Sequence, residues 1–109
     1  SENMFLNMVI CIETRLTPQQ ILEATQKIEK EIGRKNKSLS GYSDRIIDID
    51  LILCDNLIID TKELTIPHPR FHERFFVLEP LNEIAPDLIH PTMGKTVREL
   101  LFELCSSLR

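Results

Sequence analysis

The sequence predicts an α+β fold in which helices cover one face of a mainly antiparallel sheet. Three observations predict it: apolar residues that alternate over short segments, two helix starts that each carry a capping box, and the order in which strand and helix patterns follow along the chain. The 109 residues are 42% hydrophobic, which fits one modest domain over residues 1–109 and leaves no room for a second core.

The N-terminal segment has the pattern of a strand. Its apolar side chains recur at every second residue, at Leu6, Met8, Ile10 and Ile12. This period of two predicts a strand over residues 4–14. The chain starts with Ser and enters the strand pattern almost at once, so we expect it to be a fragment or a processed chain.

A helix and a loop follow the first strand pattern. Thr17 supplies an N-cap, a proline occupies the first helical position, and Gln20 can close a capping box. Apolar residues at helical spacing predict a helix over residues 18–32, with Gly33 as its left-handed C-cap. The polar, turn-rich stretch of residues 34–45 predicts a mobile basic loop.

The second half of the chain predicts a hairpin and two helices. The patterns give a strand, a tight turn, a partner strand, an extended proline-rich segment and a short helix, at residues 46–54, 55–56, 57–59, 65–69 and 71–83. A second capping box, Thr96 with Glu99, begins a terminal helix. The order of these elements makes a ferredoxin-like arrangement the natural candidate.

Asp48 and Asp50 are the first candidate site residues. In a strand, side chains two residues apart point the same way, about 7 Å from each other. Two carboxylates placed so would repel each other, and a Mg²⁺ ion, which takes carboxylate, water and phosphate oxygens, removes the repulsion. The alternative is a solvated outer face of an amphipathic strand. The basic loop before the strand favours the metal, because phosphoryl-transfer sites combine a metal with cationic side chains.

His68, Arg74 and Phe76 form a second candidate group. Prolines on both sides restrict the backbone of His68, which suits it to a phosphate contact; packing is the alternative. A zinc site shared with His72 is disfavoured, because Pro69 interrupts the helix that such a pair needs. Arg74, Phe75 and Phe76 can present a guanidinium beside an aromatic ring, an arrangement suited to phosphate and a flat heterocycle, with core packing of the two rings as the alternative.

Charge and cysteine content narrow the function classes. The formal net charge of −4 argues against a nucleic-acid binder, although a local basic patch is compatible with it. The three cysteines are odd in number and far apart, so they predict neither a disulfide framework nor a zinc site, and we expect a reduced, cytoplasmic protein. No membrane span or export signal is predicted.

Several motifs together resemble one enzyme family. The most specific is Arg-Ile-Ile-Asp-Ile-Asp-Leu-Ile-Leu at residues 45–53, followed by Leu-Thr-Ile-Pro-His-Pro-Arg-Phe at 64–71, Arg-Phe-Phe-Val-Leu-Glu-Pro-Leu at 74–81 and Glu-Ile-Ala-Pro-Asp at 83–87. In this order the motifs resemble hydroxymethyl-dihydropterin pyrophosphokinase, a folate-biosynthesis family that moves a diphosphate from ATP to a pterin alcohol. The resemblance covers essentially the whole chain and implies a ferredoxin-like fold.

The resemblance also implies roles for individual residues. Asp48 and Asp50 would bind two Mg²⁺ ions, with ATP as co-substrate and with Asp48 also on the pterin side. The catalytic set comprises Arg45, Asp48, Asp50, His68 and Arg74. The ATP side comprises Gln26, Glu29, Arg34, Leu51, Thr65 and His68. The pterin side comprises Phe5, Asn7 and Phe76, where Asn7 would form hydrogen bonds and Phe76 would stack.

The chain departs from the family pattern in several places. The family's first strand with its Gly-Ser-Asn segment, the following helix, the next strand and a substrate loop are absent, so we expect an incomplete domain that self-associates through an exposed sheet edge. Ser43 and Asp44 replace a usual Gly-Pro pair. A usual loop arginine is either replaced by Asn36 or displaced to Lys35 or Lys37. Two other classes stay open: a noncatalytic module that binds Mg²⁺ and nucleotide, and a structural or oligomerising domain.

Overall fold

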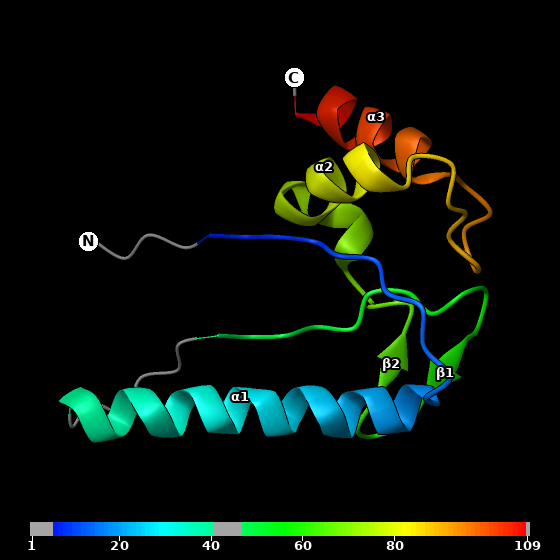
Figure 1. Cartoon of the computed structure of the whole chain (residues 1–109). Helices are drawn as coiled ribbons and strands as arrows, with labels where there is room; N and C mark the ends of the chain where they lie inside the picture. The colour runs from blue at the N-terminus through cyan, green and yellow to red at the C-terminus, as the bar shows by residue number, and fades with distance from the viewer. Residues whose placement is uncertain (1–5, 41–46, 109) are drawn as a thin grey trace. The chain divides into compact units, whose positions relative to one another are not determined.

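The computed structural model describes residues 6–40 and 47–108. Within these ranges lie three α-helices, a 3₁₀-helix and one two-stranded sheet. The chain divides into two compact units, residues 14–51 and residues 1–13 with 52–109, and each is described by itself (Figure 1). The predicted α+β class is confirmed, in a mostly helical form.

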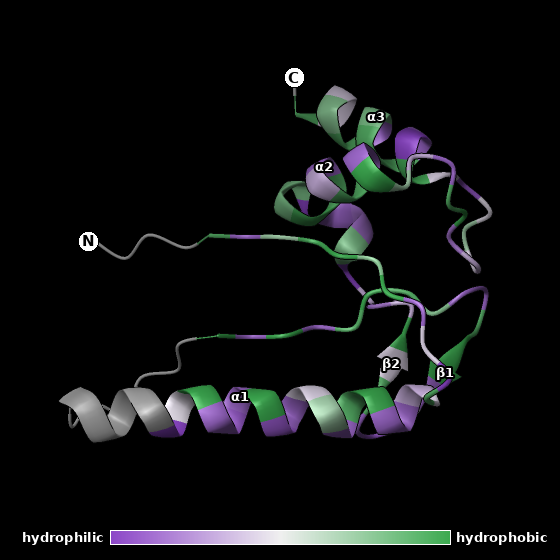
Figure 2. Cartoon of the chain, viewed as in Figure 1, coloured by the Kyte–Doolittle hydropathy of each residue, from purple (hydrophilic) through white to green (hydrophobic). Residues whose placement is uncertain are grey.

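Helix α1, Pro18–Ser40, dominates the unit of residues 14–51. Its predicted capping box is present, because Thr17 N donates to Gln20 Oε1 at 2.9 Å and Gln20 N donates to Thr17 Oγ1 at 3.2 Å. Hydrophobic and hydrophilic residues alternate along the helix (Figure 2). Burial along α1 does not follow hydropathy everywhere. Glu29 is part-buried, whereas the adjacent Ile28, which belongs to the predicted apolar face, is exposed.

Helix α1 is longer than the sequence predicted. Gly33 does not act as a C-cap, and the first part of the predicted loop, residues 34–45, is helical as far as Ser40. One reason is that Arg34 pairs with Glu31, one turn earlier, at 3.3 Å, and Arg and Lys are intrinsic helix formers. A second is that a glycine inside a helix costs only about 1 kcal/mol, which does not end the helix by itself.

The strands predicted over residues 4–14 and 46–54 are wrong for the residues that the structure describes. Residues 6–14 and 47–54 do not form strands (Figure 1). A strand requires hydrogen bonds to a neighbouring strand, and an alternating pattern does not supply that neighbour. The apolar residues of the alternating pattern in the N-terminal segment are exposed, and it is Val9, which lies between them, that packs against the core.

The turn predicted at residues 55–56 is present, but it does not join two paired strands. Leu57 N donates to Cys54 O at 3.0 Å, which closes the turn. Asp55 has a φ of 52°, in the left-handed region that Asp adopts more readily than most residues. Strand pairing begins only further along the chain.

Strands β1, Ile59–Asp60, and β2, Thr65–Ile66, form the two-stranded sheet. They are antiparallel, with the first residue of β1 opposite the last of β2. Thr61 closes the connection, because its Oγ1 donates to Leu64 O at 3.1 Å and accepts from Leu64 N at 3.0 Å. Of the strand predicted at residues 57–59, only Ile59 lies in β1, which pairs with residues further along the chain, so the hairpin predicted with residues 46–54 was wrong.

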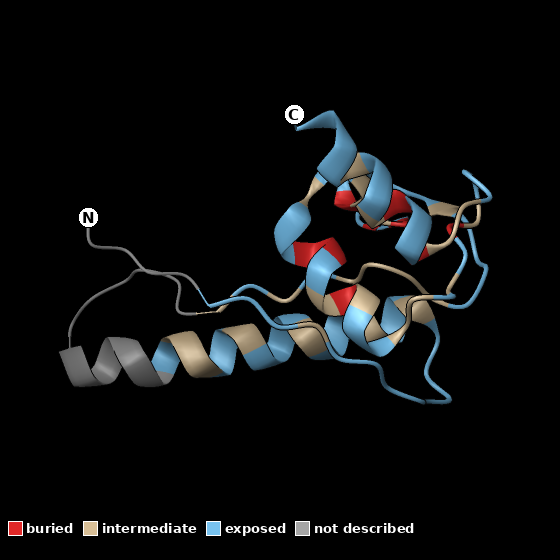
Figure 3. Ribbon diagram, turned by 90° about the horizontal axis from the view of Figure 1, so that it is seen from above, coloured by how far each residue is buried: buried red, intermediate tan, exposed pale blue. Residues whose placement is uncertain are grey.

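Three helical segments enclose the core of the second unit. They are η1, Phe71–Glu73, α2, Phe75–Ile84, and α3, Val97–Ser107. The single helix predicted over residues 71–83 is divided at Arg74 into η1 and α2, and the predicted terminal helix is present as α3. The buried apolar side chains come from all three (Figure 3): Phe71, Val77, Leu78, Leu81, Val97 and Leu100. Ile52 and Leu53 pack against this core, so a segment predicted as a strand contributes to it without strand pairing.

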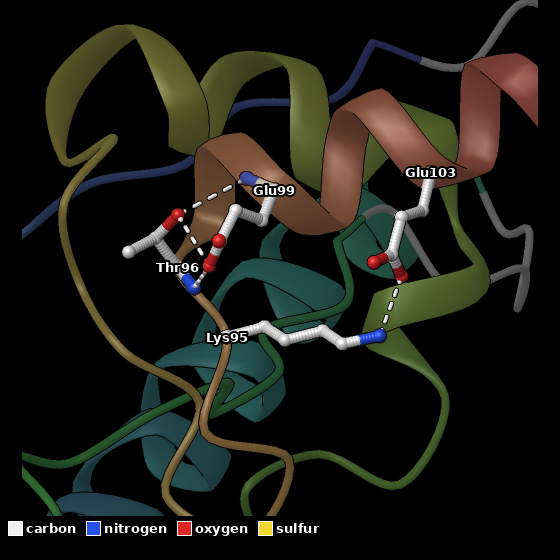
Figure 4. A network of polar contacts seen from close by, with 4 residues as sticks. All are labelled: Lys95, Thr96, Glu99 and Glu103. Atoms are coloured by element: carbon white, nitrogen blue, oxygen red, sulfur yellow. Dashed lines mark hydrogen bonds and ion pairs between the residues drawn. The ribbon is translucent and has the colours of Figure 1, made fainter.

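The start of α3 follows the sequence prediction. Thr96 Oγ1 accepts from Glu99 N at 3.1 Å, and Glu99 Oε1 accepts from Thr96 N at 2.8 Å (Figure 4). Lys95 Nζ also lies 2.9 Å from Glu103 Oε1, which adds an ion pair one turn further along the helix. These contacts fix the entry of the chain into α3.

Candidate functional site

A pocket of about 250 Å³ lies against one face of α2. Its lining residues are Asn7, Phe76, Glu79, Pro80 and Glu83. The last four recur at intervals of three and four residues, so they share one face of the helix. Asn7 and Phe76, both predicted for the pterin side, therefore line the same pocket although they are far apart in the sequence.

Arg74 precedes α2 and lies beside the aromatic ring of this pocket. Its guanidinium carbon is 5.7 Å from the centroid of the Phe76 ring, within the range of a cation–π contact. Its backbone oxygen accepts from Val77 N and Leu78 N, each at 3.0 Å, which fixes the backbone at the start of the helix. The guanidinium and the ring are neighbours, as the sequence predicted, so a cation suited to phosphate lies beside a ring suited to stacking.

A second pocket, of about 480 Å³, includes residues of the β1–β2 hairpin. Thr65 and His68, both predicted for the ATP side, line it. The backbone of His68 is held in place, because its N donates to Ile52 O at 2.8 Å. Its ring Nδ1 accepts from Arg70 N at 3.3 Å, which places the proton of the neutral ring on Nε2.

Three histidines line the second pocket, and the sequence analysis gave a ligand-contacting role to His68 alone. His90 is 5% exposed and stacks on Phe71, with ring centroids 5.2 Å apart and planes 11° from parallel. Its Nδ1 accepts from Met93 N at 3.1 Å. Burial lowers the pKa of His90, and the nearby His72 lowers it further, so the neutral ring is favoured. In the sequence, the signal available for His90 was its position directly before a proline.

Asp48 and Asp50 lie in the other unit. Both side chains are exposed, whereas Ile49 between them is part-buried, so the predicted alternation of faces is present without strand pairing. Glu29 of α1 reaches this segment, because its Oε2 accepts from Ile49 N at 2.6 Å. This contact joins α1 to the segment that carries the two carboxylates.

The donor chemistry of Asp48 and Asp50 fits Mg²⁺. Among residues 6–40 and 47–108, no three His, Cys, Asp or Glu side chains gather into a metal-binding group. Mg²⁺, however, commonly takes only one or two carboxylates and completes its shell with water and substrate phosphates. Two exposed carboxylates two residues apart are compatible with that ligand set.

The other predicted residues contribute less to the described sites. Gln26 is exposed on α1, and Arg34 is exposed and paired with Glu31. Leu51 is part-buried in the same unit. Phe5 and Arg45 lie outside the described residues, as do the departures from the family pattern at residues 43 and 44.

A comparison with protein families agrees with the motifs. The family model for 7,8-dihydro-6-hydroxymethylpterin-pyrophosphokinase (HPPK) matches residues 1–86. The chain belongs to the HPPK family. The resemblance inferred from the motifs is therefore confirmed.

Relatives of this HPPK-family chain occur in bacteria and fungi. It is 42% identical over 99 residues to the 2-amino-4-hydroxy-6-hydroxymethyldihydropteridine pyrophosphokinase of Aquifex aeolicus, covering 91% of the chain and 61% of that protein. It is 46% identical over 93 residues to the Porphyromonas gingivalis protein of the same name, covering 84% and 63%. It is 44% identical over 102 residues to Folic acid synthesis protein fol1 of Schizosaccharomyces pombe, covering 94% and 14%. The chain thus spans about three fifths of these bacterial relatives.

Two carboxylates of the first pocket had no place in the sequence analysis of this HPPK-family chain. Glu79 and Glu83 lie three and seven residues after Phe76, a spacing that puts them on its side of a helix. That spacing was the available signal, and it required the helix to be known first.

In the described part of the chain, no helix has both the length and the apolar character needed to cross a membrane.

Proposed function

We propose that this chain carries substrate-binding parts of a Mg²⁺-dependent pyrophosphokinase that transfers diphosphate from ATP to the hydroxymethyl group of 6-hydroxymethyl-7,8-dihydropterin. The proposal rests on two pockets in the unit of residues 1–13 with 52–109, each lined by residues assigned to one substrate. Asn7 and Phe76, proposed for the pterin, line one pocket, and Thr65 and His68, proposed for ATP, line another. Family membership supports the same assignment.

The pterin side is proposed to work by stacking and hydrogen bonding. The Phe76 ring offers a face to a flat heterocycle, and the Asn7 amide offers both a donor and an acceptor to its polar edge. Arg74, at 5.7 Å from the Phe76 ring, would bring a positive charge next to the bound pterin. That position suits the diphosphate that arrives at the hydroxymethyl group.

The ATP side is proposed to work by charge neutralisation and positioning. Asp48 and Asp50 would hold Mg²⁺, which when bound neutralises negative charge on the ATP phosphates. The Nε2 proton of His68 and the guanidinium groups of Arg45 and Arg74 would donate to phosphate oxygens. Phosphoryl transfer depends mostly on such positioning and electrostatic stabilisation.

The proposed reaction is a single displacement. The hydroxymethyl oxygen of the pterin attacks the β-phosphorus of ATP, and a new P–O bond forms. The bond from that phosphorus to the oxygen it shares with the α-phosphorus breaks, AMP leaves with both bonding electrons, and the hydroxyl proton is released. The diphosphate ends on the pterin.

The proposal includes a ferredoxin-like sandwich for the complete domain. The exposed alternating residues of the N-terminal segment and the alternation around Asp48 and Asp50 both have the pattern of strands. Neighbouring strands would convert these segments into members of a larger sheet. Hydrogen exchange in a longer chain that includes the family's N-terminal strands tests this, because protection should appear at alternate amides of both segments.

Isothermal titration of the 109-residue chain tests the function. The probes are α,β-methylene-ATP, whose bridge cannot be cleaved, with excess Mg²⁺, and the pterin alcohol. We expect each to bind and Mg²⁺ to be required for the nucleotide. No heat from either ligand at millimolar concentration would contradict the proposal. Nucleotide binding with no pterin binding and no release of AMP from ATP would favour the noncatalytic module instead.

A further inference from the structure

We infer that Glu29 is a positioning residue, which sets the Asp48–Asp50 segment through its backbone. The inference rests on the proposed function, which assigns Mg²⁺ to Asp48 and Asp50. It starts from one contact, the hydrogen bond from Ile49 N to Glu29 Oε2 at 2.6 Å. This contact joins a helix to a segment 20 residues further along the chain.

The bonded amide lies between the two aspartates, so the contact can orient both of them. Ile49 lies between the two aspartates, and its N–H belongs to the peptide plane that begins at the carbonyl of Asp48. Because that plane is rigid, fixing the N–H direction constrains the backbone on both sides of it. The exposures agree: Asp48 and Asp50 are exposed, and Ile49 is part-buried.

The contact is stronger than an ordinary hydrogen bond. A carboxylate that accepts from a backbone N–H forms a charge-assisted bond, about twice as strong as a neutral one, and such bonds are short. Glu29 is part-buried, so its charge is less screened by solvent than that of an exposed carboxylate. Glu31 on the same helix is different, since it pairs with Arg34 at the surface.

The bond engages one of the two carboxylate oxygens of Glu29. The family resemblance placed Glu29 with the ATP-side residues, next to Gln26 and Arg34. The structure instead directs Oε2 at the backbone of the segment that carries the proposed metal ligands. Its effect on nucleotide binding is therefore expected to run through the metal.

Two substitutions separate positioning from direct contact. Glu29→Gln keeps an acceptor oxygen for Ile49 N without the charge, whereas Glu29→Ala removes the acceptor. Glu23→Ala is the matched control, because Glu23 is an exposed carboxylate on the same helix. The readouts are the exchange rate of the Ile49 amide, the broadening of amide signals at residues 48–50 by Mn²⁺ alone, and the Mg²⁺ concentration for half-maximal binding of α,β-methylene-ATP.

Positioning gives a defined pattern across these variants. Glu29→Ala should speed exchange at Ile49 and raise the required Mn²⁺ and Mg²⁺ concentrations about tenfold, the size expected for loss of one good hydrogen bond. Glu29→Gln should stay within about threefold of the parent chain, because the neutral acceptor retains part of the bond. Glu23→Ala should match the parent in all three measurements.

Three results would overturn the inference. Equal loss of nucleotide affinity in Glu29→Gln and Glu29→Ala, with Mn²⁺ binding unchanged, would mean direct nucleotide contact. A lower melting temperature in Glu29→Ala with unchanged metal dependence would mean a structural role only. No Mn²⁺ broadening at residues 48–50 in the parent chain would leave nothing to position. Mn²⁺ binding without nucleotide or pterin binding would instead refute the proposed function and leave positioning to be decided by the Glu29 variants.

Discussion

The guanidinium of Arg74 lies over the ring of Phe76, with 5.7 Å between the guanidinium carbon and the ring centroid. Phe76 lines the smaller pocket, and Arg74 stands directly before the helix that carries it. A charge for phosphate and a surface for a flat ring thus occur side by side within one unit. Under the proposed function, the side chain that contacts phosphate and the side chain that stacks on the pterin therefore touch each other.

Replacing Arg74 should therefore affect both substrates. We expect Arg74→Ala to weaken nucleotide binding about tenfold or more, because a charge-assisted phosphate contact is lost. Pterin binding should weaken about two- to fivefold, since an exposed cation–π contact contributes roughly 0.5–1 kcal/mol. Titration calorimetry with each ligand measures both. Arg70→Ala is the control, because the Arg70 side chain is exposed and pairs with Glu73, and the substitution keeps the backbone N–H that donates to His68. Equal effects of the two variants would contradict the assignment.

Asp48→Ala and Asp50→Ala should each abolish Mg²⁺-dependent nucleotide binding and leave the fold intact. Both side chains are exposed, and substitutions at exposed positions usually change the free energy of unfolding by no more than about 0.5 kcal/mol. Urea unfolding and nucleotide titration measure the two effects separately. Glu63→Ala, which removes an exposed carboxylate near the hairpin, should retain binding. Unfolding of either aspartate variant, or nucleotide binding equal to the parent, would show that the carboxylates are not metal ligands.

His90 should make the stability of the unit of residues 1–13 with 52–109 depend on pH. Burial and the neighbouring His72 lower the pKa of His90 below its usual 6.5 in the folded chain, so the unfolded chain binds more protons. Stability contributed by neutral His90 is therefore fully present above about pH 6.5 and is lost as the pH falls from there through the lowered pKa.

The variant His90→Phe isolates this contribution. It keeps a ring to stack on Phe71 but cannot accept a hydrogen bond from Met93 N. We therefore expect the free energy of unfolding to fall by about 1–3 kcal/mol at about pH 7.5. Below about pH 6.5 its free energy of unfolding should fall less steeply than that of the parent. Urea unfolding across this range measures both slopes, and identical slopes would show that His90 does not govern the pH dependence.

Local signals were the part of the fold that the sequence predicted well. The capping boxes at Thr17 and Thr96 use hydrogen bonds within three residues, so the local sequence contains all that they need. The end of α1 was misplaced because Gly33 is a frequent C-cap and not an obligatory one. The strands over residues 4–14 and 46–54 failed because strand formation depends on a distant partner, which no local pattern reveals.

The candidate site shows the same division. The alternation of Asp48, Ile49 and Asp50 and the nearness of Arg74 to Phe76 follow from spacing along the chain, and both are present. The pocket shared by Asn7 and Phe76 required the family resemblance, since their separation in sequence is long. Contacts such as that of Glu29 with Ile49 depend on how α1 packs, so they could not be predicted from the sequence.

The cap at α3 provides a test of stability that is independent of function. Thr96→Ala removes the acceptor for Glu99 N, and an N-cap threonine typically contributes about 1 kcal/mol. We expect a loss of that size in thermal or urea unfolding, with ligand affinities unchanged. Thr96→Ser keeps the hydroxyl and should recover most of the loss. A serine variant as unstable as the alanine variant would assign the effect to the methyl group and not to the cap.

The N-terminal segment should make the 109-residue chain self-associate. Its apolar side chains are strongly exposed, at 94% for Leu6, 80% for Met8, 67% for Ile10 and 59% for Ile12. Exposed apolar patches promote association, because burying them against a second copy removes them from water. Sedimentation should show a mass that rises with concentration, and Met8→Lys with Ile10→Lys should return the chain to a monomer. Phe102→Lys is the control, since Phe102 is 72% exposed but lies on α3. A monomer at all concentrations, or an equal effect of the control, would contradict association through this segment.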